Sequence, residues 1–159
     1  MSVARPVGSN HQLARLLQIG VVLEEVVEAR AARHARSTPG LDGELRDLLE
    51  DASEESAEHR ARLERLIDDL DAETVPFEEV EALVESQYEA GDDFDGVLYD
   101  QLCNEETAYK FYDDLIESIE NSEAQFGIER DRLLDVLSSI REEEAEGVEE
   151  VTELMEERE

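Results

Sequence analysis

Residues 98–119 read LYDQLCNEETAYKFYDDLIESI, and this stretch decides the fold because its inward positions recur with the period of an α-helix. The side chains that share this face are Leu98, Gln101, Glu105, Ala108, Tyr112, Leu115, Ile116 and Ile119. The face is apolar at both ends and polar near its middle, at Gln101 and Glu105. Because such a helix must bury its stripe against other helices, the stretch predicts a helical bundle with a carboxylate inside.

Three other long segments show the same period and the same interruption. They cover about residues 10–36, 41–71 and 129–156, while the segment quoted above extends over about 94–121. Near the midpoint of each, the inward stripe carries polar residues, namely Glu24, the Ser56/His59 pair and Glu144. The lengths of the predicted helices place these residues and Glu105 in one cross-section of the bundle.

The connections favour two helical hairpins joined by a long crossover. Short turns near residues 37–40 and 125–127 make antiparallel pairs of the first two and the last two long helices. The middle connection, at about 72–93, is longer and carries a short amphipathic helix with Phe77, Val80, Leu83 and Val84. We therefore predict a single all-α domain over residues 1–159, with its four-helix bundle at about 10–157.

The two halves of the chain share a short repeat. Residues 52–59, ASEESAEH, align with residues 140–147, IREEEAEG, and both contain the pattern E-E-x-A-E. Residues 23–25 align in the same way with residues 104–106. The repeat is in register with the apolar stripes. It aligns Glu24 with Glu105, and it aligns Ser56 and His59 with Glu144 and Gly147.

The charge of the chain is extreme, with 45 acidic residues against 14 basic ones and a net charge of −31. Lys110 is the only lysine. Such self-repulsion destabilises a compact fold in dilute buffer, and molar salt removes most of it by screening. We expect a protein of an extreme halophile; an acidic mimic of nucleic acid is the alternative. Direct binding of nucleic acid is disfavoured, because the phosphates would be repelled.

Cysteine content and hydropathy exclude several further classes of protein. Cys103 is the only cysteine, which excludes a disulfide framework and any four-cysteine iron or zinc centre. No apolar run approaches the ~20 residues that span a bilayer, and the first ten residues lack the apolar core of a signal peptide. We therefore expect a cytoplasmic protein with no membrane partner.

Three inward carboxylates in one layer repel one another, and their pKa values rise unless a cation is present. No lysine or arginine lies on the stripes, although Arg60 and Arg141 lie at their edges and are one source of positive charge. A metal ion is the other source, and carboxylates with an imidazole suit iron, manganese or zinc. Glu55 precedes His59 by one helical turn, so either Glu55 or Ser56 faces the core, depending on the rotation of the helix.

On these residues the chain resembles the ferritin-like superfamily, and in particular its rubrerythrin-type members. Their pattern has a Glu on helices one and three and a Glu-x-x-His on helices two and four, with a long crossover between two hairpins. The match is best at Glu105-x-x-Ala108-x-x-x-Tyr112, and Glu24 is similar to the ligand of helix one. Helix two reads Ser56-x-x-His59 and keeps the His, whereas helix four reads Glu144-x-x-Gly147 and keeps the Glu.

Two hypotheses follow for the function. In the first, the resemblance implies that Glu24, His59, Glu105 and Glu144 bind one or two Fe or Mn ions. Glu55 would be a possible bridge, Tyr112 and Gln101 would support the ligands, and the chemistry would be oxidation of Fe(II) by O₂ or peroxide. In the second, the bundle has lost its metal and serves as a non-catalytic interaction or scaffold module.

A second apolar strip on the first helix bears on the oligomeric state. It consists of Ile19, Val22 and Val26 and lies away from the main stripe. Either the crossover helix covers this strip or another subunit does. We expect a homodimer.

Overall fold

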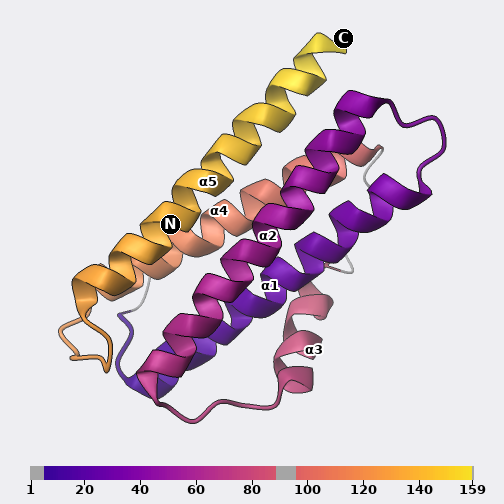
Figure 1. The fold of residues 1–159 in the computed structure, drawn as a ribbon. Helices are drawn as coiled ribbons and strands as arrows, with labels where there is room; N and C mark the ends of the chain where they lie inside the picture. Colours follow the sequence, from indigo (N-terminus) through magenta and orange to yellow (C-terminus); the bar gives the residue numbers. More distant parts are fainter. Residues whose placement is uncertain (1–5, 89–95, 159) are drawn as a thin grey trace.

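The computed structural model describes residues 6–88 and 96–158, and within them every regular element is an α-helix (Figure 1). The elements are α1 (Asn10–Ser37), α2 (Gly43–Leu70), α3 (Phe77–Tyr88), α4 (Val97–Glu120) and α5 (Arg130–Glu157). The predicted all-α bundle is thus confirmed, with the long helices beginning and ending within about three residues of the expected positions. The predicted start at Phe94, the predicted end of the crossover helix near residues 90–93, and the side chains of Leu83 and Val84 lie outside the described part of the chain.

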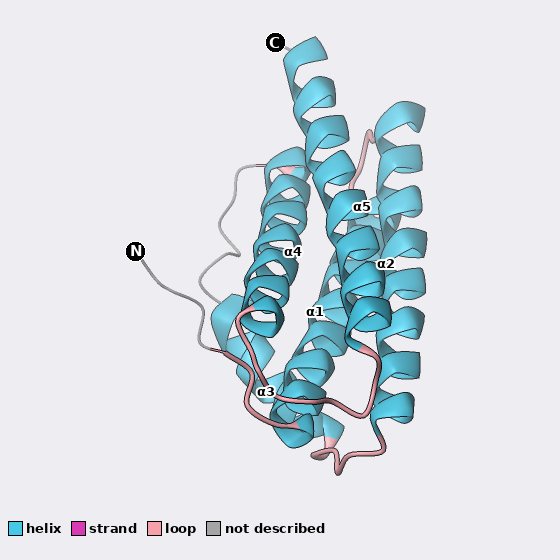
Figure 2. Ribbon diagram, turned by 90° about the vertical axis from the view of Figure 1, so that its left-hand side faces the viewer, coloured by secondary structure: helices cyan, strands magenta, loops and turns pink. Residues whose placement is uncertain are grey.

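The four long helices form two antiparallel hairpins, α1 with α2 and α4 with α5, that lie side by side (Figure 2). The start of α1 lies at the end of α4, where the Val7 amide donates to the Ser118 carbonyl at 3.1 Å. At the opposite end, Arg158 after α5 pairs with Asp42 before α2 at 2.7 Å. Because α2 ends at the first of these ends and α4 begins at the second, the connection between them runs the length of the bundle.

The interior is divided into a large and a small apolar core with polar residues between them. The large core, near the α1 start, includes Leu13, Leu17, Leu63, Leu66, Tyr112, Leu133, Leu137 and Ile140. The small core, near the α5 end, includes Ala31, Leu45, Leu49 and Leu154. Along α2 the sequence passes from Leu49 through buried Ser56 and His59 to Leu63, so the polar layer follows directly from the order of residues in the helix.

The crossover helix α3 covers the second apolar strip of α1. Val80 and Val22 are both buried and pack together, with Ile19, Val26 and Val75 around them. Gln18 ties the crossover to α1, since its side chain donates to the Val75 carbonyl at 2.9 Å and accepts from the Val75 amide at 3.2 Å. The strip is therefore covered within the chain and gives no support to a homodimer, which stays a prediction. Phe77, expected on the same apolar face, is 40% exposed.

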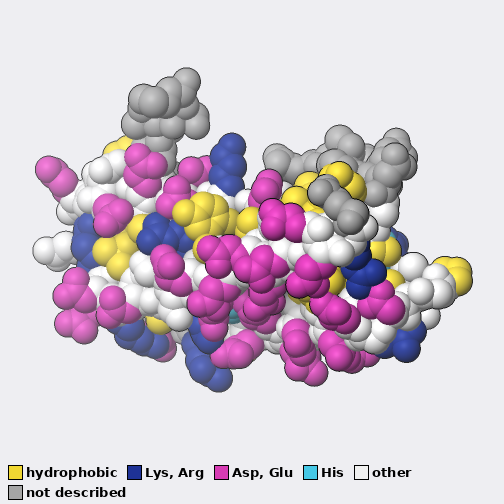
Figure 3. Space-filling model, turned by 90° about the horizontal axis from the view of Figure 1, so that it is seen from above, with side chains coloured by type: hydrophobic (Ala, Val, Ile, Leu, Met, Phe, Trp, Pro, Cys, Tyr) yellow, Lys and Arg dark blue, Asp and Glu magenta, His cyan; other side chains and the backbone are white. Residues whose placement is uncertain are grey.

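The surface carries most of the acidic residues. Figure 3 shows one face on which aspartate and glutamate side chains spread over most of the surface and basic side chains are scattered. None of the described helices is long and apolar enough to cross a bilayer.

We expect the melting temperature of the protein to rise steeply with KCl concentration. The screening length falls from ~30 Å at 0.01 M salt to ~3 Å at 1 M, which removes most of the repulsion among the charges behind the net −31. Each kcal/mol of repulsion removed raises the melting temperature of a chain of this size by about 2–4 °C. Thermal unfolding followed by circular dichroism across this range measures the effect, and a melting temperature independent of salt would contradict it.

A partly buried ion network joins the end of α1 to the start of α4. Asp100 accepts from Arg30 at 2.6 Å and lies 2.8 Å from the His34 Nε2, and its side chain is 9% exposed. Burial raises the pKa of Asp100, but the hydrogen bonds from Arg30 and His34 outweigh burial and lower it overall. The network fixes the register of α1 against α4, which sets the relative height of Glu24 and Glu105.

Replacing Asp100 with alanine is expected to lower the free energy of unfolding by about 3 kcal/mol, the low end for a buried pair, because Arg30 and His34 lose a mostly buried partner. Asp113 offers a matched control, since it also pairs with an arginine, Arg141, but its side chain is 48% exposed. Asp113→Ala should cost less than about 1 kcal/mol. Urea unfolding in molar KCl measures both, and equal costs would contradict the assigned role of Asp100.

Candidate metal centre

Side chains from three helices meet between the two apolar cores. Glu24 of α1, His59 of α2 and Glu144 of α5 are all buried, with 0%, 1% and 4% of their surface exposed. The His59 Nδ1 atom lies 2.9 Å from the Glu144 Oε1 and 3.4 Å from the Glu24 Oε1. One donor atom from each residue lies within 4.8 Å of the other two, so the three form a compact His/Glu/Glu group.

The Glu24 carboxylate is held on one side only. Tyr112, fully buried on α4, donates its hydroxyl to the Glu24 Oε1 at 2.8 Å. The Glu24 Oε2 is buried and has no hydrogen-bond partner among the described atoms. Burial and the neighbouring Glu24 charge raise the pKa of Tyr112 well above its usual value, so it stays a phenol and a donor. Because a buried carboxylate oxygen without a partner is costly, the free Oε2 indicates a missing cation or donor.

The other ring nitrogen of His59 faces a second pair of carboxylates at the edge of the bundle. The His59 Nε2 lies 2.9 Å from the Glu143 Oε2 and 3.7 Å from the Glu55 Oε1. Arg62 donates to Glu143 at 3.0 Å and to Glu58 at 2.5 Å. A carboxylate on the outer nitrogen of a histidine fixes the tautomer and the ring orientation, which leaves Nδ1 for a metal.

The helix α4 contributes the carboxylate of Glu105, which lies against α5. Glu105 accepts from the Gln101 side chain at 2.9 Å and lies within hydrogen-bonding reach of Glu144. A Cβ atom built on Gly147 would lie 2.5 Å from the Glu105 Oε2 and 3.0 Å from its Oε1. The absence of a side chain at Gly147 therefore makes the room that Glu105 occupies.

The metal-free cluster holds extra protons. Burial alone would lower the pKa of His59, but its hydrogen bonds to Glu144 and Glu24 outweigh burial and raise the pKa to about 11. Burial raises the pKa of both Glu105 and Glu144, and the repulsion of Glu24 adds to the rise. At neutral pH His59 is an imidazolium, and the Glu105/Glu144 pair keeps a proton.

We expect the free energy of unfolding of the metal-free protein to fall as the pH rises from 6.5 to 9. The usual pKa of histidine is 6.5, so the stability due to His59 is fully present below that pH and is lost toward about 11. The raised pKa of Glu144 acts with the same sign from 4.5 upward. Each retained proton gives a slope of about 1.4 kcal/mol per pH unit. Urea unfolding in EDTA measures it; a rise over this range would contradict the assigned protonation.

The donor set fits a divalent transition metal. Two donors bound at ~2.1 Å and at right angles around one ion lie about 3 Å apart. The His59 Nδ1 lies at 2.9 Å and 3.4 Å from its two carboxylate neighbours, which matches this spacing. One imidazole and two carboxylates suit iron, manganese or zinc. A metal would replace the protons of the cluster, so its affinity should rise with pH.

The structure brings the sequence-predicted residues together around His59. Glu24, His59 and Glu144 form the group, Glu55 lies on the side of the outer nitrogen of His59, and Glu105, Gln101 and Tyr112 line the α4 side. Glu143, which also lies on the outer nitrogen, was not among the predicted site residues. Ser56 faces the core and is 4% exposed, whereas the Glu55 side chain is 38% exposed and still reaches His59.

Arg60 and Arg141, considered as sources of positive charge, pair with Glu28 and Asp113 instead. Sequence reasoning passed over Arg62, which reaches Glu143. Its position three residues after His59, on the same side of α2, is the signal that could have found it.

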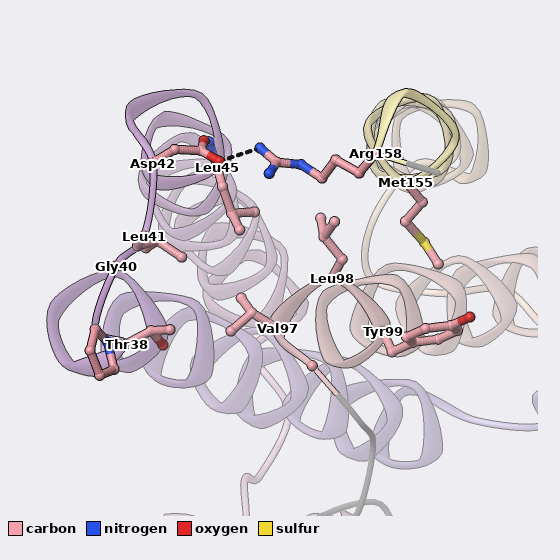
Figure 4. Close-up of a pocket in the computed structure, with 12 residues that line it drawn as sticks. Thr38, Gly40, Leu41, Asp42, Leu45, Val97, Leu98, Tyr99, Met155 and Arg158 are labelled. Carbon is pink, nitrogen blue, oxygen red and sulfur yellow. Dashed lines mark hydrogen bonds and ion pairs between the residues drawn. The ribbon is translucent and has the colours of Figure 1, made fainter.

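A cleft of about 430 Å³ opens elsewhere, at the end of the bundle beside the small apolar core (Figure 4). It is lined by Leu41 and Leu45 of the α2 side, Leu98 of α4 and Met155 of α5, with the Asp42–Arg158 ion pair across it. Met155 follows Glu144 by eleven residues, about 16 Å along a helix. The cleft is therefore separate from the His/Glu/Glu group.

Comparison of the chain with protein-family models, with curated proteins and with solved structures gives no match.

Proposed function

We propose that the protein is a metal-binding helical bundle of the ferritin-like type, with an Fe or Mn ion held by Glu24, His59 and Glu144. The observation that carries the proposal is the Glu24 Oε2, a buried carboxylate oxygen that has no hydrogen-bond partner among the described residues and lies beside an imidazole and a second carboxylate. The connectivity of the helices supports the ferritin-like part of the proposal. Two hairpins joined by a crossover along the bundle are the arrangement that di-iron carboxylate bundles use.

The charges of the group support a divalent ion. Two carboxylates neutralise one divalent ion when His59 binds as a neutral imidazole, so Glu24, Glu144 and the ion together carry no net charge. With iron as the bound ion and coordination positions left open, the site would oxidise Fe(II) to Fe(III) while O₂ or peroxide is reduced, and we propose this as the reaction class. The chain's own contribution is to orient His59 through Glu143, to hold Glu24 through Tyr112, and to exclude bulk water from the group.

A second candidate function is a scaffold module without metal. The observation in its favour is that His59, as an imidazolium, already gives Glu24 and Glu144 a positive partner. The cluster would then be a structural ion network, and the bundle would act through its surface. Homodimerisation and a halophilic, cytoplasmic setting remain part of both proposals.

Thermal unfolding in molar KCl tests the two candidates against each other. An ion that binds only the native state raises the melting temperature. The free energy of unfolding increases by about 2.7 kcal/mol when the free ion is at 100 times its dissociation constant. We expect Mn(II), and anaerobic Fe(II), to stabilise EDTA-treated protein, while Mg(II) at the same concentration has a smaller effect because it prefers oxygen ligands. Identical melting with and without the transition metals would favour the scaffold module.

A further inference from the structure

We infer that the cluster binds a single divalent ion, held by Glu24, His59 and Glu144, and that Gly147 keeps Glu105 out of its coordination shell. This inference rests on the proposed metal function and specifies it. It differs from the two-ion arrangement that the resemblance leaves open, and it assigns Glu105 as a positioning residue for Glu144.

The first argument is where the Glu105 carboxylate lies. Both of its oxygens are within 3.0 Å of the point where a Cβ of Gly147 would be, so the group is seated on the backbone of α5. The Gln101 side chain holds the Oε1 at 2.9 Å in this position. Glu105 is not part of the group in which the donor atoms of Glu24, His59 and Glu144 lie within 4.8 Å of one another. Glu105 therefore reaches the group of three ligands only through Glu144.

The second argument is the supply of ligands for a second ion. By the repeat, the residues that would mirror Glu144 and His59 on the other side of the layer are Ser56 and Gly147. Neither offers a carboxylate or an imidazole. An ion beside Glu105 would therefore have that carboxylate, a share of Glu144 and the neutral Oε1 of Gln101, which is buried without a partner.

The third argument is the histidine. The other group whose donor atoms lie within 4.8 Å of one another consists of Glu55, His59 and Glu143, so it shares His59 with the first group. A neutral imidazole has one nitrogen that carries a proton and one that can bind a metal, so His59 binds one ion at a time. The described ligand groups therefore supply one histidine for one ion.

The variant Glu105→Gln separates a ligand from a positioning residue. A glutamine keeps an oxygen to accept from Gln101 and gains an amide that donates to Glu144, so both hydrogen bonds of the site are retained. If Glu105 acts only through Glu144, the variant should still bind one Mn(II), with an affinity lowered by no more than about 100-fold. Glu106→Gln, at the exposed neighbouring position, is the matched control.

The test is an anaerobic Mn(II) titration of EDTA-treated protein in molar KCl, with bound metal and the electron paramagnetic resonance spectrum measured together. We expect one tightly bound Mn(II) per chain, with the spectrum of an isolated ion, in the wild type and in Glu105→Gln. Two tightly bound ions with an exchange-coupled spectrum, or loss of binding in Glu105→Gln by more than about 100-fold, would overturn the inference and leave the metal function standing. Absence of tight Mn(II) in the wild type would overturn the metal function itself.

Discussion

Replacing Glu144 with alanine is expected to lower the affinity of the protein for Mn(II) by at least about 100-fold, because it removes a direct ligand rather than an outer partner, whose loss costs about 10–100-fold. Glu144 is the residue on which the contacts of the site converge. It lies 2.9 Å from the His59 Nδ1 and is hydrogen-bonded to Glu105. Glu24 and Glu143 remain as partners of His59 in this variant, so we expect it to fold without metal.

The surface of the protein makes a matched control essential for this prediction. With 45 acidic residues, the chain binds divalent cations weakly at many places, and molar KCl suppresses most of that binding. Glu146 lies two residues after Glu144 on the exposed side of α5. Glu146→Ala removes the same charge from the same helix and should leave the tight site unchanged. Equal affinities of the two variants, measured by calorimetry, would show that the binding belongs to the surface.

Replacing His59 with leucine is expected to lower the free energy of unfolding of the metal-free protein by about 3–5 kcal/mol at pH 8, the usual cost of leaving a buried charge without its partner. His59 is 1% exposed and contacts carboxylates on both ring nitrogens. Leucine fills much of the volume but neither donates a proton nor carries charge. The cost should be larger at pH 5, because the stability due to His59 is fully present below its usual pKa of 6.5 and is partly lost at pH 8.

A combined variant distinguishes lost charge from lost packing. In His59→Leu with Glu24→Gln and Glu144→Gln, the carboxylates that need the imidazolium are gone as well. Removing both partners of a buried polar contact is close to neutral, so this variant should recover most of the stability at pH 8. Urea unfolding in EDTA measures all of these variants. A His59→Leu cost that is the same at pH 5 and pH 8, with no recovery in the combined variant, would assign the effect to packing.

Much of the fold could be predicted because apolar residues recur with the period of an α-helix in all four long segments. The apolar period placed all four long helices, and the break at Thr74 to Pro76 placed the start of α3. The burial of Glu24, Glu105 and Glu144 also followed from their phase, since a carboxylate on the inward stripe of a helix cannot reach water when the helix is packed. Length and phase are properties of one helix, so no knowledge of its neighbours was needed.

The rest depended on how helices meet. The Ile19/Val22/Val26 strip required a cover, but whether α3 or a second subunit provided it was set by the path of the crossover. The contact of Glu105 with Gly147 depends on the approach of α4 to α5 at the scale of an ångström, which a helical period does not contain. The same holds for Asp100 against Arg30, which depends on the register of α4 against α1.

The most direct test of the central claim is the metal content of the protein after EDTA treatment and equilibrium dialysis against micromolar Mn(II) in molar KCl. On the proposed function we expect one Mn(II) per chain in the wild type and in Glu146→Ala, and none above background in Glu144→Ala. A wild type that retains no more metal than Glu144→Ala, with Fe(II) under anaerobic conditions giving the same result, would contradict the claim that Glu24, His59 and Glu144 form a metal site.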